Sequence, residues 1–171
     1  MRTALVATLL GLTLLAPPAR AQGNDADARA VIAKFKEKKP DLAKFFSNAR
    51  GYAVFPTVGK GGIGLGGARG KGYVYERGKL IGRSTLTQVT IGLQLGGQAY
   101  SEIVFLEDHD AMESFKRGRL KLDGQASAIA VTARAALDLA YRNGVAIVTM
   151  AKGGLMYEAS VGGQKFSFKP L

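Results

Sequence analysis

A glycine-rich stretch from Gly51 to Gly72, GYAVFPTVGKGGIGLGGARGKG, most constrains what this chain can fold into. It holds nine glycines, three basic residues and no acid. We expect a strand that is interrupted at Pro56, followed by a second strand in which glycines at 62, 64 and 66 alternate with Ile63 and Leu65, because a period of two is typical of strands. A strand with one bare face lets a backbone, helix or ligand approach closely, and it lets a sheet bend sharply.

Basic residues lie among these glycines, at Lys60, Arg69 and Lys71. Exposed backbone N–H groups and cations therefore occur together, and this combination suits an anionic group. The same stretch also matches the dinucleotide-binding pattern, with glycines at 62, 64 and 67. That pattern requires a helix directly after it, whereas the residues that follow, from Tyr73 to Arg77, are strand-like, so we do not expect a nucleotide site.

The first 21 residues predict an export signal. Arg2 provides a positive start, an apolar run extends from Thr3 to Ala16, and Ala19-Arg-Ala21 has the small-x-small form of a cleavage site. The apolar run is shorter than the roughly 20 residues of a membrane span. We therefore expect a protein that begins near Gln22 and lies outside the cytoplasm, in the periplasm or peripherally on a membrane.

Length and charge predict one domain with a negatively charged partner. The 150 residues after the expected cleavage are enough for a single core. From Gln22 to Arg83 there are 13 basic and 5 acidic residues, whereas from Ser84 to Leu171 there are 9 and 8. In an exported protein, such a basic half suits lipid or acidic polysaccharide better than nucleic acid.

Two helices are expected before the glycine-rich stretch. From Asp25 to Lys39 the apolar residues follow the helical period, and Pro40 ends the pattern. A second, short helix is expected from Pro40 to Phe46. One interpretation places this basic amphipathic segment on an anionic membrane, and the other packs its apolar face on a sheet with the lysines in water; the two are compatible.

The rest of the chain predicts mostly strands. We expect strands from Tyr73 to Arg77 and from Lys79 to Thr85 on either side of Arg77-Gly78, and a long two-faced strand from Thr85 to Leu95 with a bend at Gly96-Gly97. Further strands are expected from Tyr100 to Leu106 and from Val145 to Met150, together with a short helix capped at Asp108 or Asp110. The segment from Ala126 to Ala140 is compatible with helix or strand. Gly162-Gly163 predicts a hairpin that joins 155–161 to 164–168.

The sequence contains no assembled catalytic machinery. There is no cysteine, and the single histidine, His109, lies among acids that suit a helix start. No serine motif accompanies it, and the carboxylates at 102, 107, 123 and 158 are too scattered to select a catalytic pair. We expect a protein that is not an enzyme and that uses no metal or other cofactor, although a hydrolase based on His109 is a further hypothesis.

Three long runs of the sequence resemble the SYLF domain. They are GYAVFPTVGKGGIGLGGARGKGYVY, LTQVTIGLQLGGQAYSEIVF and VAIVTMAKGGLMYEASVGGQKF, and the resemblance extends from Asp27 to Pro170. This family is found in bacterial exported proteins and in eukaryotic proteins beside SH3 or FYVE modules, and it includes a yeast member that binds and bundles actin. The resemblance implies a lipid-binding domain without enzymatic activity, related to eukaryotic members that bind phosphoinositides partly through a basic N-terminal segment.

Transferred to this chain, the resemblance implies a lipid contact on a set of eight basic residues: Lys34, Lys36, Lys38, Lys39, Lys44, Lys60, Arg69 and Lys71. The leading hypothesis is a peripheral module of the cell envelope that binds anionic phospholipid, with no nucleic acid partner. The alternative is a structural protein that binds an envelope polymer or a protein filament. For the fold we expect α+β, with a strongly bent antiparallel sheet that could close into a barrel and N-terminal helices packed against it.

Overall fold

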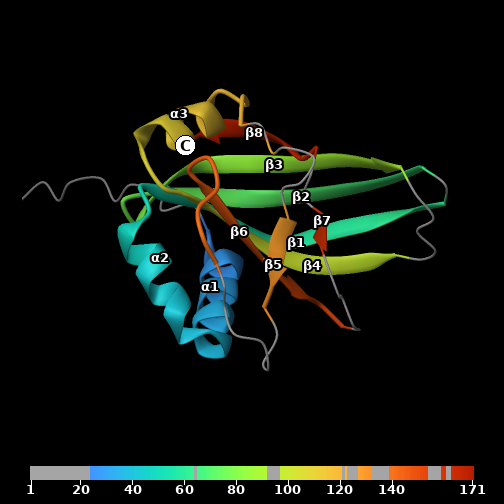
Figure 1. The fold of residues 1–171 in the computed structure, drawn as a ribbon, viewed down its shortest axis with the longest axis horizontal. Helices are drawn as coiled ribbons and strands as arrows, with labels where there is room; N and C mark the ends of the chain where they lie inside the picture. Colours follow the sequence, from blue (N-terminus) through green and yellow to red (C-terminus); the bar gives the residue numbers. More distant parts are fainter. Residues whose placement is uncertain are drawn as a thin grey trace, which may run out of the picture.

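The structure is a computed structural model that describes residues 24–63, 65–91, 97–120, 122, 127–131, 139–153, 159–160 and 163–171. The expected leader, Met1 to Ala21, lies outside these residues. Helices pack against the two faces of one bent sheet, and the longest strands project well beyond the helices (Figure 1). The predicted α+β class is therefore confirmed.

The two helices expected before the glycine-rich stretch are present. They are α1 (Ala26–Lys38) and α2 (Ala43–Asn48), joined by the 3-10 turn η1 (Pro40–Leu42). Their buried residues are the ones that share the apolar stripe: Ala28, Val31, Phe35, Leu42 and Phe45. The apolar face of this segment thus packs on the sheet, which confirms the predicted position of the helices.

Six strands form the antiparallel part of the sheet, in the order β6-β4-β1-β2-β3-β8. The short β5 joins β6 in parallel, and β7 pairs with β5 at that edge. The strands are β1 (Gly51–Ile63), β2 (Leu65–Glu76), β3 (Lys79–Ile91), β4 (Gln98–Leu106), β5 (Ser127–Ala130), β6 (Val145–Ala151), β7 (Ala159–Ser160) and β8 (Lys165–Pro170). The parallel pair is a departure from the purely antiparallel sheet expected.

The glycine-rich stretch is a long hairpin rather than two strands separated at Pro56. β1 continues through Pro56 with a register shift, so the proline causes a bulge and the strand does not end. The chain then reverses, since Ile63 pairs with Leu65 and Gly62 with Gly66. The expected alternating strand across 62–66 is therefore wrong, because the glycines there permit a reversal that a period of two cannot reveal. The absence of a helix after these glycines in the described chain agrees with rejecting the nucleotide pattern.

Other local predictions are confirmed. Arg77 and Gly78 form the tight turn between β2 and β3, with φ angles of 49° and 75°. The helix α3 (His109–Lys116) is capped by Asp108, whose Oδ1 accepts a 2.8 Å hydrogen bond from the Ala111 amide. In the segment from Ala126 to Ala140, which is compatible with helix or strand, residues 127–130 form a strand, and 126 and 132–138 lie outside the described residues. Gly96, at the predicted bend, also lies outside them.

The hairpin predicted at Gly162-Gly163 is wrong. In the described part of the chain β7 pairs with β5, whereas β8 pairs with β3 between Gly82 and Thr87, so the two segments lie at opposite edges. A turn signal is local, and it could not show that each arm has a different partner. Residues 154–158 and 161–162 lie outside the described residues.

The sheet curls strongly but is not closed into a barrel, since β7 and β8 form separate edges among the described strands. The rings of Phe55 on β1 and Phe166 on β8 lie 5.8 Å apart, although β2 and β3 separate these strands. Glycines on the concave side of β2 make room for this curl. A Cβ atom on Gly72 would lie 2.6 Å from Phe55 Cδ1, and one on Gly70 would lie 2.8 Å from Val58 Cγ2.

The two faces of the sheet carry separate cores. Under α1 and α2 is an aromatic cluster in which Tyr52 stacks on Tyr75 and Phe105 contacts Phe45 and Phe46. On the concave face, strand residues pack with α3 and β8 around Phe55, Phe115 and Phe166. We call these the helix face and the curled face.

Candidate functional site

An open groove of about 740 Å³ lies on strands β1, β2 and β3, beside the first turn of α1 and on the same side of the sheet as the helix face. Its lining is mostly strand backbone and small side chains from the glycine-rich hairpin: Pro56, Thr57, Gly59, Gly70 and Gly72 among them. The cations that line it are Arg69, Lys71 and Arg83, and the one acid is Asp27. We call it the basic groove.

Strand alternation explains why the cations share this side. Along β2 the glycines at 70 and 72 are buried on the curled face, so the odd-numbered Arg69 and Lys71 point outward and are exposed. The face of β2 that has only glycine at 70 and 72 therefore lies on the concave side of the sheet, and the cations lie on the opposite face. The expectation that glycines and cations occur together is met in the groove, where the backbone of Gly59, Gly70 and Gly72 lies beside Arg69 and Lys71.

Arg83, in the lining, and Lys152, which contacts the lining residue Thr57, add to the positive charge of the groove. The guanidinium carbon of Arg83 lies 4.1 Å from the centre of the Tyr73 ring, a cation–π contact that orients it across the groove wall. From the end of β6, Lys152 Nζ donates a 2.6 Å hydrogen bond to Thr57 Oγ1. An anion in the groove could therefore meet charges from β2, β3 and the segment after β6.

The eight predicted lipid-contact residues fall into three groups. Arg69 and Lys71 line the basic groove. Lys60 alternates onto the curled side with Val58 and is half-buried. The other five, none of which lines the described groove, lie on α1 or α2 or between them: Lys34, Lys36, Lys38, Lys39 and Lys44.

The helix lysines face solvent over aromatic residues. Lys36 Nζ lies 4.7 Å from the centre of the Phe46 ring, and Lys44 Nζ lies 5.6 Å from that of Phe45. Lys34 and Lys38 are exposed. These lysines form a second basic surface, separate from the groove, with their stems covering the helix core.

Arg83 and Lys152 were absent from the predicted set. No signal in the sequence indicated Arg83, because regular pairing around the Arg77-Gly78 turn would place Gly82 opposite Tyr73, and only the register shift between Val74 and Tyr75 places Arg83 there. Lys152 likewise gave no signal, since its contact with Thr57 spans 95 positions of the chain.

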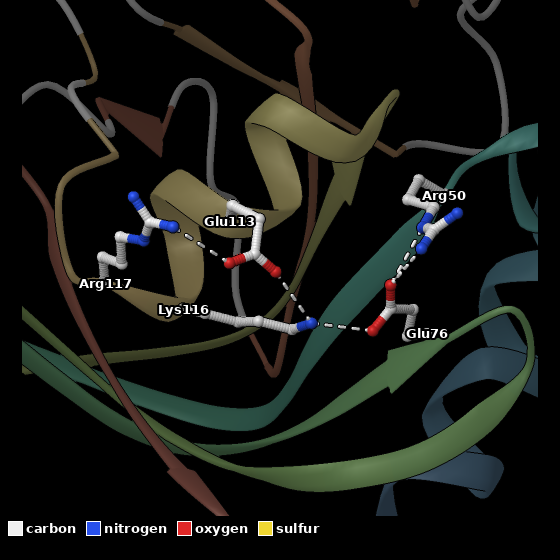
Figure 2. Close-up of polar contacts among 5 residues, drawn as sticks. All are labelled: Arg50, Glu76, Glu113, Lys116 and Arg117. Atoms are coloured by element: carbon white, nitrogen blue, oxygen red, sulfur yellow. Dashed lines mark hydrogen bonds and ion pairs between the residues drawn. The ribbon is translucent and has the colours of Figure 1, made fainter.

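Another charged cluster is structural rather than a free surface (Figure 2). The carboxylate of Glu76, at the end of β2, forms ion pairs with Arg50 Nη2 and Lys116 Nζ, each at 2.8 Å. Lys116 Nζ also pairs with Glu113. The hydrogen bond from Lys116 and that from Arg50 lower the pKa of Glu76 against the opposing effect of burial. This network attaches α3 to the base of the β1–β2 hairpin.

The described residues show no cluster of three or more metal-ligating side chains. His109 is exposed at the first position of α3, as expected for a histidine at a helix start. Among the described helices, none is long and apolar enough to cross a membrane.

Comparison with known proteins supports the resemblance described above. The family model "Ysc84: Las17-binding protein actin regulator" matches residues 87–170. "Beta cell expansion factor A" from Aeromonas veronii is 27% identical over 154 residues, which are 88% of this chain and 58% of that protein. The chain thus spans less than two thirds of this relative's length. The segment 87–170 therefore belongs to the Ysc84 (SYLF) family.

Proposed function

We propose that this protein binds anionic lipid membranes peripherally and without catalysis, with the basic groove as the main contact. The observation that supports this most directly is that Arg69, Lys71 and Arg83 line one open groove with a single acid in its lining, while Lys152 contacts the lining residue Thr57. Lipid phosphate groups offer the negative charge and the acceptor oxygens that such cations bind. Export to the bacterial envelope belongs to the same proposal.

The charges are sufficient for reversible binding. Each basic residue near an anionic surface contributes about 1 kcal/mol, so four would give an affinity that salt weakens strongly. The helix lysines are a secondary contact, because they are exposed but form no groove of their own among the described residues.

The outer end of β2 and β3 adds an apolar contact. Val89 is 71% exposed, and it pairs in register with Gly67, next to the Arg69–Thr87 pair. Alternation places Val89 on the same side of the sheet as Arg69 and Lys71. A membrane would thus meet an apolar residue at the projecting end and cations behind it.

The test is co-sedimentation of the protein from Gln22 with phosphatidylcholine vesicles, with and without phosphatidylglycerol, at low and high salt. Binding is expected only to the anionic vesicles and is expected to be lost in high salt. The double variant Arg69→Glu/Lys71→Glu should weaken binding at least about 30-fold, because two contacts of about 1 kcal/mol each are lost.

The matched control is Lys34→Glu/Lys38→Glu, which changes the net charge by the same amount on exposed positions. We expect it to weaken binding about threefold or less, as a secondary contact would. An equal loss in both variants would show that only net charge matters, and it would contradict the groove assignment. No binding to anionic vesicles would contradict the function itself.

A protein partner is the second candidate, favoured by the family description, which names Las17 binding and actin regulation. In this chain the same basic groove would then receive an acidic protein segment or filament. Pelleting with filaments in the absence of lipid, lost in Arg69→Glu/Lys71→Glu, would support this candidate over the membrane.

A further inference from the structure

A buried carboxyl group lies inside the curled face. Glu102 on β4 is 0% exposed, and its Oε2 accepts a 3.0 Å hydrogen bond from Gln164 Nε2. Gln164 directly precedes β8, and three strands lie between β4 and β8 in the sheet. Since neighbouring strands are about 4.8 Å apart, a flat sheet would separate β4 and β8 by about 19 Å. The hydrogen bond therefore closes the curl.

The surroundings of Glu102 are polar but incompletely paired. Among the described residues, Glu102 Oε1, Gln164 Oε1 and Thr149 Oγ1 have no hydrogen-bond partner. Thr149 of β6 stands opposite Glu102 in the strand register, so its side chain lies on the same face. All three residues are at most 2% exposed. An ionised carboxylate here would lack a described cation to neutralise it, and such a buried charge is costly.

We propose that Glu102 is a proton-controlled latch: its neutral form is compatible with the closed curled face, and its ionised form favours opening of the β8 end of the sheet, where water can reach the charge. Glu102 Oε2 accepts the Gln164 hydrogen bond and can do so in either charge state. Ionisation instead places a charge where no described cation neutralises it, and opening at β8 relieves that cost.

Burial is also the main cause of a raised pKa at Glu102, to about 8, while the Gln164 hydrogen bond lowers it in part. The other titratable group beside Glu102 is Tyr100, on the same strand. Burial raises the pKa of Tyr100 above its ordinary value, so the Tyr100 hydroxyl remains neutral. Of the charged residues on the packed elements, Lys60 alternates onto this side of β1, and Lys116 and Glu113 of α3 pair with each other. The latch therefore weakens as pH rises from about 4.5 to about 8.

β8 is the element that gives way. β4 is paired along both sides, with β1 and β6, whereas β8 pairs along one side with β3 in the described chain. Release would expose Phe166 of β8 and Phe55 of β1, whose rings now contact each other. This inference does not depend on the proposed membrane binding.

Hydrogen exchange of the peptide covering 163–171 tests the latch between pH 6 and 9.5, with rates corrected for intrinsic base catalysis. In the wild type, protection is expected to fall at least tenfold between pH 6 and pH 8 and to level off above pH 8. Glu102→Gln, which keeps a neutral donor and acceptor, should hold its protection across this range. The exposed Glu37→Gln is the matched control and should behave like the wild type.

A second variant and a direct titration guard against misfolding of Glu102→Gln. Gln164→Ala should exchange quickly at β8 already at pH 6 and show little further change with pH. Carbon-13 NMR of the wild-type Glu102 carboxyl should show a midpoint near pH 8. A midpoint below pH 6, or an equal alkaline loss of β8 protection in wild type and Glu102→Gln, would overturn the proposal.

Discussion

The two faces of the sheet bury their acidic groups in opposite ways. On the helix face, Asp25 at the start of α1 is buried but accepts a 2.8 Å hydrogen bond from Tyr75 and pairs with Arg29. On the curled face, Glu102 accepts a hydrogen bond from Gln164 but forms no ion pair with a described cation. The comparison shows that burial alone does not determine the charge state of an acid, because hydrogen-bond donors and nearby cations can outweigh the effect of burial on its pKa.

The two acids therefore give stability opposite pH dependences. Burial raises the pKa of Asp25, but the hydrogen bonds from Tyr75 and Arg29 and the Arg29 charge outweigh it, so the net pKa is lowered. Its contribution is present above the ordinary value of 3.8 and is lost as pH falls through the lowered pKa. For Glu102 the contribution is full below 4.5 and is lost as pH rises through about 8.

The largest effect is expected from removing one fully buried ring on each face. Phe105→Ala on the helix face and Phe55→Ala on the curled face should each lower the free energy of unfolding by about 3–5 kcal/mol, through lost burial and a residual cavity. Denaturant unfolding measures both. Hydrogen exchange should distinguish them, since only Phe105→Ala is expected to loosen α2, and loosening of α2 in both variants would mean that the two cores act as one.

A smaller effect should come from filling the bare side of β2. Gly72→Ala should cost about 1–3 kcal/mol, because its Cβ would lie 2.6 Å from Phe55. Gly59→Ala, in the same hairpin but with no described heavy atom within 4 Å of the added Cβ, should change stability by about 0.5 kcal/mol or less. Equal costs at both positions in thermal unfolding would contradict the role of the glycines in the curl.

Asp25→Asn should cost about 1–2 kcal/mol at pH 7, because it weakens a hydrogen bond to a charged group. As pH falls below 3.8, the variant should lose less stability than the wild type, since the group with the lowered pKa is gone. Urea unfolding at pH 7 and pH 3 measures the difference. A variant whose acid loss matches that of the wild type would place the acid-sensitive group elsewhere.

The smallest effect is expected at the rim of the Glu76 network (Figure 2). Arg117 is 62% exposed and pairs with Glu113 at 3.6 Å, so Arg117→Ala should cost about 0.5 kcal/mol or less. Lys116→Ala should cost more, about 1 kcal/mol, because Lys116 joins Glu113 to Glu76. The reverse order in thermal unfolding would show that α3 is not held through Glu76.

Much of the fold was predictable because its signals are local. The helical period from Ala28 to Phe35, the Arg77-Gly78 turn and the Asp108 cap each depend on residues a few positions apart. The hairpin expected at Gly162-Gly163 failed for the same reason, since a good turn sequence does not state which strands its arms will join. The candidate site was predictable in part: Arg69 and Lys71 were identified, but Arg83 and Lys152 were not.

The sequence by itself determined the family, the helices, most strands and the excess of positive charge in the first half, since these are properties of composition and short-range pattern. Only the tertiary structure decided that Gly70 and Gly72 lie on the concave side of β2 while Arg69 and Lys71 lie on the other side. It also decided that Glu102 meets Gln164 across the curl. The physical reason is that strand pairing and curvature join residues distant in the chain, and these contacts determine which polar groups are exposed and which are buried.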